Sequence, residues 1–572
     1  MKNKKRNTVL LVSGLIAWAF GYAVEIILLS FRPESVDPDL PRELNRLNIL
    51  IVFLLSWPVL YYLFGIRHGI IHSKNEKLTK LLQPKPTGFL PQKVSGTFLT
   101  DGSREAKAFR IIALCAGIAI VFLMPPLTAP DEQAHFTCLY PISRGQFLAQ
   151  PDENGAACRD YPAEWSAFFN EYPDRLLGQK NTEKFSFDDI RKAAALVPDS
   201  GETERSYVTG VSLGYGAAAI GMRIVSAIGD LTGIKALNSV YAQITAGRLF
   251  NLMVYVLLIG SAIRRAPHFR RTILLLGCMP MTLYLGSSLN YDAMLIPLAV
   301  YYVALILSLC RDPEKQLTGG EIVRVYGCVF LMTGIKYAYA PLLLLLLAIP
   351  RRKYGGWGKL FLCVGGAVLA GVLGFLPTIL QNRLVPPDPQ AFYDSGQQDQ
   401  VWWLQEHPLQ IPGLFLNTIN VRGASYVISF WGCLGWLDVH IPYGFIAVGV
   451  FMIFICALYE GFSFMDWAGQ RWKNWLPFIG STVCIVGIAI TMYIGHTLIY
   501  HAVGGPVIEG IQGRYFIPCF LPMVLALSNG SLKNLEAMDR PGAGEGLSRV
   551  AMAWSGCCAL ITIGTLLLRY WI

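Results

Sequence analysis

The stretch IIALCAGIAIVFLMPPLT (Ile111–Thr128) and the polar segment Pro130-Asp-Glu-Gln-Ala-His135 that follows it decide the fold of this chain. The first is an uncharged apolar run, about as long as an α-helix must be to cross the roughly 30 Å hydrocarbon core of a bilayer. The second brings charged side chains to the point where that helix leaves the membrane. Because apolar runs of similar length recur along the chain, the sequence predicts an all-α, polytopic membrane protein.

The composition supports this fold class. Of the 572 residues, 53% are hydrophobic and only 15% are charged, whereas soluble domains carry about 25% charged residues. The formal net charge is +10, but Lys and Arg lie in short patches between apolar runs, as in the cytoplasmic loops of membrane proteins. A nucleic-acid-binding protein gathers its basic residues on one soluble face, so we expect no nucleic-acid partner.

The chain divides into three regions. Residues 1–66 are expected to be an N-terminal pair of transmembrane helices, and their basic first residues indicate a cytoplasmic N-terminus. Residues 67–110 are rich in Lys, Arg and Pro and are expected to be a cytoplasmic linker. The main membrane domain covers residues 111–572. Its longest polar segment, about residues 129–237, then becomes a loop on the extracytoplasmic side.

Counting the apolar runs predicts about 11–13 helices. Val208–Ile228 is rich in glycine and is expected to be interfacial or re-entrant, whereas Thr272–Leu289 is expected to be one outward crossing. Ile322–Ile349 has polar or basic segments at both ends, and both stay on the cytoplasmic side only if the run bends near Lys336 into two shorter helices. Half-helices of this kind mark binding sites in membrane proteins.

Charged side chains near a bilayer are costly and are therefore candidates for function. The first group is Asp131, Glu132 and His135. Acidic residues are favoured in the first turn of a helix, which would by itself explain the two carboxylates. A carboxylate beside the membrane could instead deprotonate an incoming hydroxyl. Asp131 and Glu132 could also hold a divalent cation such as Mg²⁺ or Mn²⁺ through oxygen ligands.

Three further groups lie near the predicted outer rim. Asn290 and Asp292 fall in a segment that an ordinary turn would also explain. Lys336 lies inside an apolar run, where its long side chain could simply reach for the interface; at a bend between helices it could hold a phosphate. Asp438 and His440 form the fourth group.

The fifth group is the loop Glu509-Gly-Ile-Gln-Gly-Arg-Tyr515. Its glycines let backbone N–H groups approach an anion closely, and Arg514 could grip a phosphate with two parallel hydrogen bonds. Gln512 and Tyr515 flank this arginine. A basic residue at the start of a helix is the alternative explanation. An arginine on the outer side opposes the usual distribution of positive charge, which favours a functional role.

Taken in order, the five groups resemble a bacterial family of predicted membrane proteins, domain of unknown function 2142. The strings that carry the resemblance are PDEQAH (130–135), SSLNYD (287–292), GIKY (334–337) with Pro341, GWLD (435–438) and GIQGRYFIP (510–518). The first and last are the more specific. The resemblance covers about Ile111 to Ile572 and leaves the N-terminal helix pair outside.

That family is similar in layout to the GT-C superfamily of integral membrane glycosyltransferases. The resemblance implies a GT-C-like enzyme in the bacterial cytoplasmic membrane. It would move a sugar from a polyprenyl-phosphate-type donor to a cell-envelope glycan or a lipid-linked acceptor at the outer leaflet. Asp131, Glu132 and His135 would be catalytic. The residues expected to bind substrate and its phosphate are Lys336, Arg514, Gln512, Tyr515, Asp292, Asn290, Asp438 and His440.

Two other functions would use the same residues. A transporter or flippase for a lipid-linked saccharide, or for another anionic envelope precursor, would bind its cargo with them. Such a protein would also need a polar path to the cytoplasmic side. A non-catalytic assembly protein of an envelope pathway would leave the acidic pair facing away from any cavity.

Overall fold

The computed structural model describes residues 12–24, seven single positions between 49 and 61, and residues 103–177, 183–207, 210–312, 314–461, 475–527 and 543–572. Most of the expected second N-terminal crossing and of the basic linker therefore lies outside the described residues.

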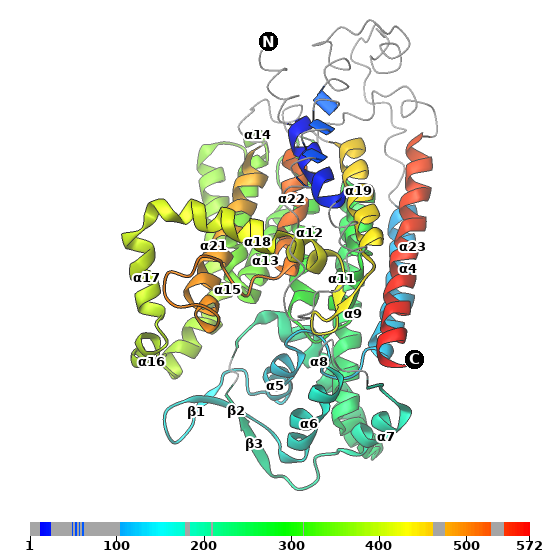
Figure 1. The fold of residues 1–572 in the computed structure, drawn as a ribbon, viewed down its shortest axis with the longest axis vertical. Coiled ribbons are helices and arrows are strands. Elements are labelled where there is room, and N and C mark those ends of the chain that lie inside the picture. The colour runs from blue at the N-terminus through cyan, green and yellow to red at the C-terminus, as the bar shows by residue number, and fades with distance from the viewer. Residues whose placement is uncertain are drawn as a thin grey trace, which may run out of the picture.

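Seven helices among the described residues are long and apolar enough to cross a membrane. They are α4 (Ser103–Leu123), α9 (Val240–Arg265), α12 (Asp292–Cys310), α15 (Trp357–Leu384), α19 (Tyr443–Glu460), α21 (Leu476–Ile494) and α23 (Ala543–Tyr570). Several of them, such as α4, α19 and α23, run along the long axis of the molecule in Figure 1. The predicted polytopic helical fold is confirmed.

The centre of the bundle differs from the prediction. The crossing expected over Thr272–Leu289 is not one continuous helix, because α10 (Arg270–Gly277) and α11 (Pro280–Gly286) are separate helices. Pro280 has no N–H to donate and disfavours helical backbone at the residue before it, and Met279 is extended, with φ −61° and ψ 141°. Every residue from 272 to 290 is buried, so this broken helix forms the interior of the protein.

The bend expected at Lys336 is confirmed. α13 (Gly319–Ile335) ends there, because Lys336 has an extended backbone (φ −155°, ψ 104°), and η5 (Tyr337–Ala348) follows. The residues on either side of this helix pair lie close together, because the Leu317 N–H before α13 donates to the Lys353 carbonyl after η5 at 2.9 Å. The pair therefore enters and leaves on one side, with Lys336 at its tip.

The described residues between 129 and 238 form a cap over one end of the bundle, at the bottom of Figure 1. The cap contains a three-stranded antiparallel sheet in the order β1-β2-β3. Its elements are α5 (Glu132–Ser143), β1 (Gln150–Pro151), β2 (Ala157–Pro162), η2 (Ala163–Trp165), α6 (Ser166–Leu176), α7 (Phe187–Ala195), β3 (Thr203–Ser206), η3 (Leu213–Tyr215), α8 (Gly216–Thr232) and η4 (Lys235–Asn238). Aromatic side chains fill its core, including the buried Phe136 and Trp165. α8, in the stretch expected to be interfacial or re-entrant, packs along α9.

The remaining elements surround the bundle. They are α14 (Arg351–Tyr354), α16 (Pro389–Asp394), α17 (Gln397–Glu406), η6 (Pro408–Gln410), α18 (Ile411–Trp431), the hairpin β4 (Cys433–Leu434) and β5 (Val439–His440), η8 (His496–Ile499), η9 (Gly513–Phe516) and α22 (Ile517–Leu527). α18 lies crosswise to the long helices in Figure 1 and packs against η9. The hairpin returns the chain into α19.

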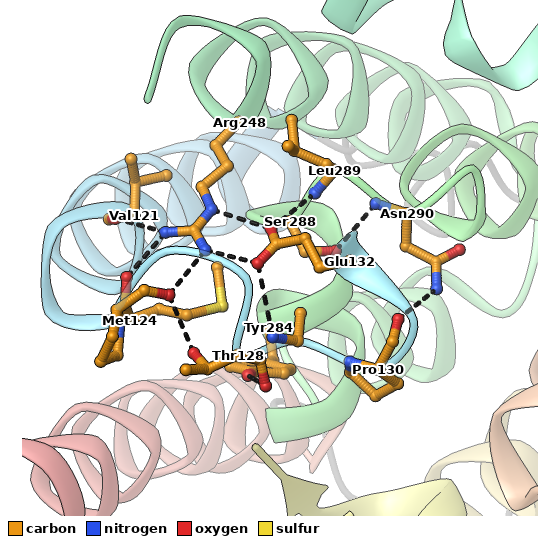
Figure 2. Close-up of polar contacts among 12 residues, drawn as sticks. Val121, Met124, Thr128, Pro130, Glu132, Arg248, Tyr284, Ser288, Leu289 and Asn290 are labelled. Atoms are coloured by element: carbon orange, nitrogen blue, oxygen red, sulfur yellow. Dashed lines mark hydrogen bonds and ion pairs between the residues drawn. The ribbon is translucent and has the colours of Figure 1, made fainter. Parts of the chain in front are cut away.

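A buried ion pair holds the start of the cap against the bundle (Figure 2). Arg248 of α9 donates from Nε and Nη2 to the two carboxylate oxygens of Glu132, at 2.9 and 2.6 Å. Both side chains are essentially inaccessible. The other guanidinium N–H groups donate to the carbonyls of Val121, Met124 and Pro125. All five N–H groups of Arg248 are thus satisfied, as a buried charge requires.

We expect Arg248→Met to destabilise the fold by about 3–5 kcal/mol, because it leaves the Glu132 carboxylate buried without its counter-charge. The double variant Glu132→Gln/Arg248→Met should recover part of that loss. Thermal unfolding of the detergent-solubilised protein measures both. Arg352→Met is the matched control, since its pair with Glu314 is 76% exposed on both sides and should contribute no more than about 1 kcal/mol. An Arg248→Met protein as stable as this control would contradict the assignment.

Candidate functional site

Charged residues from three distant parts of the chain meet where the cap joins the bundle. The Arg514 guanidinium donates from Nη2 to Asp131 Oδ2 at 2.8 Å, and its Nε lies 3.8 Å from Asp292 Oδ2. The side chains of Arg514 and Asp292 are 2% and 5% exposed, whereas that of Asp131 is 48% exposed. Asp131 is therefore the member of this cluster that an incoming molecule can reach.

The backbone explains why neighbouring Asp131 and Glu132 point to different partners. Asp131 has the left-handed conformation (φ 59°, ψ 15°) just before α5 begins, which Asp and Asn adopt more readily than other residues with a side chain. Glu132, on the first turn of the helix, is held by Arg248, and its Oε1 also accepts from Leu289 N–H at 3.1 Å. This fixes Glu132 towards the interior and leaves Asp131 to face Arg514.

Arg514 is positioned by a close approach of backbone to backbone. Gly513 lies against α18, where a Cβ atom would collide with the carbonyl of Tyr426 and the amide of Phe430, and its N–H donates to Ser429 Oγ at 2.8 Å. Only glycine fits there. Gly513 thus allows the loop to lie directly against α18, and this contact places the next residue, Arg514, in the interior. The buried Nε and Nη1 of Arg514 have no hydrogen-bond partner among the described residues, which is costly for a buried donor.

Lys336 joins the same cluster from the tip of the α13–η5 pair. Its ammonium lies 4.1 Å from the centre of the Tyr515 ring and 5.9 Å from that of Tyr291, both within the range of a cation–π contact. Tyr339 O–H donates to the Tyr515 carbonyl at 2.8 Å and ties η5 to the loop. Two cations thus lie beside two carboxylates, and the cluster carries no net charge.

His135 lies one helical turn from Asp131 and is buried. Its Nδ1 is 2.8 Å from the hydroxyl of Tyr215, and its ring meets that of Tyr291 edge-on at 5.0 Å. Burial, assisted by the positive charge of Arg514, lowers the pKa of His135 from 6.5 to about 3. The imidazole is therefore neutral at physiological pH and serves as a hydrogen-bonding group rather than a cation.

The other predicted residues divide into two sets. Asn290 supports the cluster, because its Oδ1 accepts from Asp292 N–H at 2.9 Å and its Nδ2 reaches the Pro130 carbonyl at 3.5 Å. Gln512 lies in the loop, with its Oε1 buried and without a hydrogen-bond partner in the described structure. Asp438 and His440 lie apart, in the hairpin: Asp438 is 4.0 Å from Arg569, and His440 Nδ1 is 3.3 Å from the Cys433 thiol.

The donor set fits a divalent cation poorly. The described residues contain no group of three or more His, Cys, Asp or Glu side chains that could hold a metal ion. Both carboxylate oxygens of Glu132 are bound by Arg248, so Glu132 cannot join Asp131 as a ligand without breaking the buried pair. Asp131 and Asp292 already face the positive charge of Arg514, which would oppose a second cation. We therefore assign no chemical step to a metal.

One cavity includes a residue of the cluster in its lining, and a second includes the residue that follows Lys336 in the chain. One, of about 280 Å³, lies between the cap and the β4–β5 hairpin and includes Asp131, Arg205 and Trp436 in its lining. The other, of about 390 Å³, is a groove between α13, η5 and α15 whose lining, including Tyr337 and Phe375, is almost entirely apolar. Tyr337 follows Lys336 directly, so this groove begins beside the cluster.

Sequence reasoning missed some of the residues that complete the site. Tyr215 lies in a glycine-rich stretch with no charge or motif to mark it. Tyr291 is part of the SSLNYD string, but only its neighbours Asn290 and Asp292 were selected. Arg248 is a charge within an apolar run, but nothing in the sequence pairs it with Glu132.

One family model matches the chain, over residues 114–523, and its description is predicted membrane protein (DUF2142). No curated protein and no solved structure matches the chain. The matched region includes Asp131, Asp292, Lys336 and Arg514, and it spans more than half of the 572 residues. The chain therefore belongs to the DUF2142 family of predicted membrane proteins.

Proposed function

We propose that this protein is a membrane glycosyltransferase of the GT-C type. It would take a sugar from a polyprenyl-phosphate-type donor and give it to a hydroxyl of a cell-envelope glycan or lipid-linked acceptor. The reaction would occur at the extracytoplasmic face of a bacterial inner membrane, with the N-terminus in the cytoplasm. The observation that carries this proposal is the buried, incompletely bonded guanidinium of Arg514, set with Lys336 beside an apolar groove.

This arrangement suits a lipid whose head group is a phosphate. A phosphate oxygen that displaces the Asp131 carboxylate would reach the buried Arg514 guanidinium, whose Nε and Nη1 lack a hydrogen-bond partner among the described residues. The phosphate would then convert a destabilising feature of the empty site into a charge-assisted hydrogen bond. The ammonium of Lys336 can contribute a second positive charge. The groove that begins at Tyr337 can take up the first isoprene units, since its lining is apolar.

The charge balance of the site suggests how Asp131 could act as a base. A donor phosphate would compete with Asp131 for Arg514, and the half-exposed carboxylate would be released towards the acceptor. Asp131 would then take the proton of the acceptor hydroxyl while that oxygen attacks C1 of the sugar. The bond between C1 and the phosphate oxygen breaks, and polyprenyl phosphate leaves with the electron pair. Arg514 and Lys336 would stabilise its negative charge.

The interior of the bundle supports transfer rather than transport. Another ion pair lies at the far end, where the partly buried Arg271 and the buried Glu460 are 3.2 Å apart. Between the two ends lie α10 and α11, whose buried side chains are largely aliphatic, such as Leu274, Leu275 and Leu283. A transporter or flippase needs a continuous polar path, and the described residues offer no such path along these helices.

We expect Asp131→Asn and Arg514→Ala to lower sugar transfer by about 10²–10³-fold, because the first removes the base and the second the main counter-charge. The assay uses the full chain in proteoliposomes with a panel of undecaprenyl-phosphate hexoses. Asn keeps the left-handed backbone at position 131, and Arg514→Lys keeps the charge but loses the paired geometry, so it should be intermediate. The control is Arg383→Ala, an exposed arginine at the end of α15. Full activity in both variants would exclude this function.

Filling the groove should weaken donor binding without affecting the fold. Ala340→Trp places a large side chain among the lining residues, and we expect at least about a tenfold loss of affinity for undecaprenyl phosphate in nanodiscs, which corresponds to roughly 1.4 kcal/mol. Leu369→Trp, on the exposed side of α15, is the matched control and should bind like the wild type. Equal binding by both variants would remove the groove from the donor site.

A further inference from the structure

We infer that the cavity between the cap and the β4–β5 hairpin is the acceptor site, and that its ligand is the terminal sugar of a glycan. This inference rests on the proposed function and adds to it the chemical class and location of the acceptor. The proposed ligand is a saccharide rather than a protein or a simple lipid alcohol.

The first support is the exposed Trp436 at the tip of the hairpin. It is 49% exposed and lines the cavity. The residues on either side, Gly435 and Leu437, both have positive φ angles, 61° and 63°. Leu437 is in a conformation that is unfavourable for a residue with a side chain. The exposed position of the Trp436 indole is therefore accompanied by backbone strain at the next residue.

The second support is the mixture of groups in the lining. Trp436, Tyr161 and Phe169 supply aromatic surface, while Arg205 and Gln133 supply side-chain donors. A sugar ring has an apolar C–H face and a rim of hydroxyl groups, so it needs both kinds of contact. The volume of about 280 Å³ is just below the usual range for ligand sites, about 300–1,000 Å³. It suits the end of a glycan rather than a long chain.

The third support is the position of Asp131. Its carboxylate lines this cavity and contacts Arg514 at 2.8 Å. A hydroxyl of a sugar bound against Trp436 would therefore meet the proposed base at the cavity wall. The donor phosphate would approach the same carboxylate from the Arg514 side. Asp131 is thus the point where the two substrates would meet.

The test is glycan binding to the full-length protein in nanodiscs that contain undecaprenyl phosphate, screened on an array of bacterial envelope oligosaccharides. We expect Trp436→Ala to weaken glycan binding by about tenfold or more and Trp436→Phe to retain most of it. Undecaprenyl phosphate binding should stay unchanged in both variants. In the transfer assay, Trp436→Ala should raise the acceptor KM and leave the donor KM unaltered. Trp402→Ala, a tryptophan of equal exposure on α17, is the matched control.

The outcomes separate this inference from the proposed function. Glycan binding that is equal in the wild type and Trp436→Ala would overturn the acceptor site, as would the absence of glycan binding to the wild type. In either case, the donor site would remain supported if the protein still bound undecaprenyl phosphate and if Arg514→Ala weakened that binding. Binding of peptides in place of glycans to this cavity would also overturn the inference.

Discussion

The buried pair of Glu132 and Arg248 is the interaction on which the rest of the site depends. A carboxylate that is out of water must have a counter-charge, and Arg248 meets that need through two hydrogen bonds of 2.9 and 2.6 Å. The pair joins the first turn of α5 to the middle of α9 and so fixes where the cap begins on the bundle. With Glu132 committed inwards, the preceding residue must turn the other way, and Asp131 faces Arg514. One acidic residue of the motif therefore stabilises the structure, and its neighbour is available for chemistry.

The cluster around Arg514 combines a balanced charge with incomplete hydrogen bonding. Asp131 and Asp292 offset the charges of Arg514 and Lys336, which lets four ionised groups coexist at a largely buried position. The guanidinium nevertheless has Nε and Nη1 without hydrogen bonds among the described residues, in contrast to Arg248, all of whose N–H groups are satisfied. Arg110, Arg159 and Arg422 each have one buried nitrogen, Nε, without a hydrogen-bond partner among the described residues, whereas Arg514 has two. This second nitrogen supports a ligand at Arg514.

Much of this site could be predicted from the sequence because charges near a bilayer are rare and costly. That rule selected Asp131, Asp292, Lys336 and Arg514. The bend at Lys336 was predicted because the basic segments at both ends of Ile322–Ile349 had to stay on the cytoplasmic side. The rule does not show which charges form ion pairs. It therefore could not distinguish Glu132, which is buried against Arg248, from the half-exposed Asp131. It also could not place Asp438 and His440, because their partners lie outside the cluster: Asp438 is 4.0 Å from Arg569 of α23, and His440 Nδ1 is 3.3 Å from the Cys433 thiol. Pro280 marks the helix break in the sequence, but the continuous apolar pattern of Thr272–Leu289 predicted one unbroken helix.

The two cavities differ in the way that two different substrates would require. The groove at Tyr337 is almost wholly apolar and lies between membrane helices, whereas the cavity at Trp436 mixes aromatic and polar groups and lies under the cap. Asp131 is held by Arg514 until another anion competes for that arginine. If a lipid phosphate is that anion, then the base becomes available only when the donor is in place. The same ion pair that keeps the empty site neutral would thereby favour binding of the donor first.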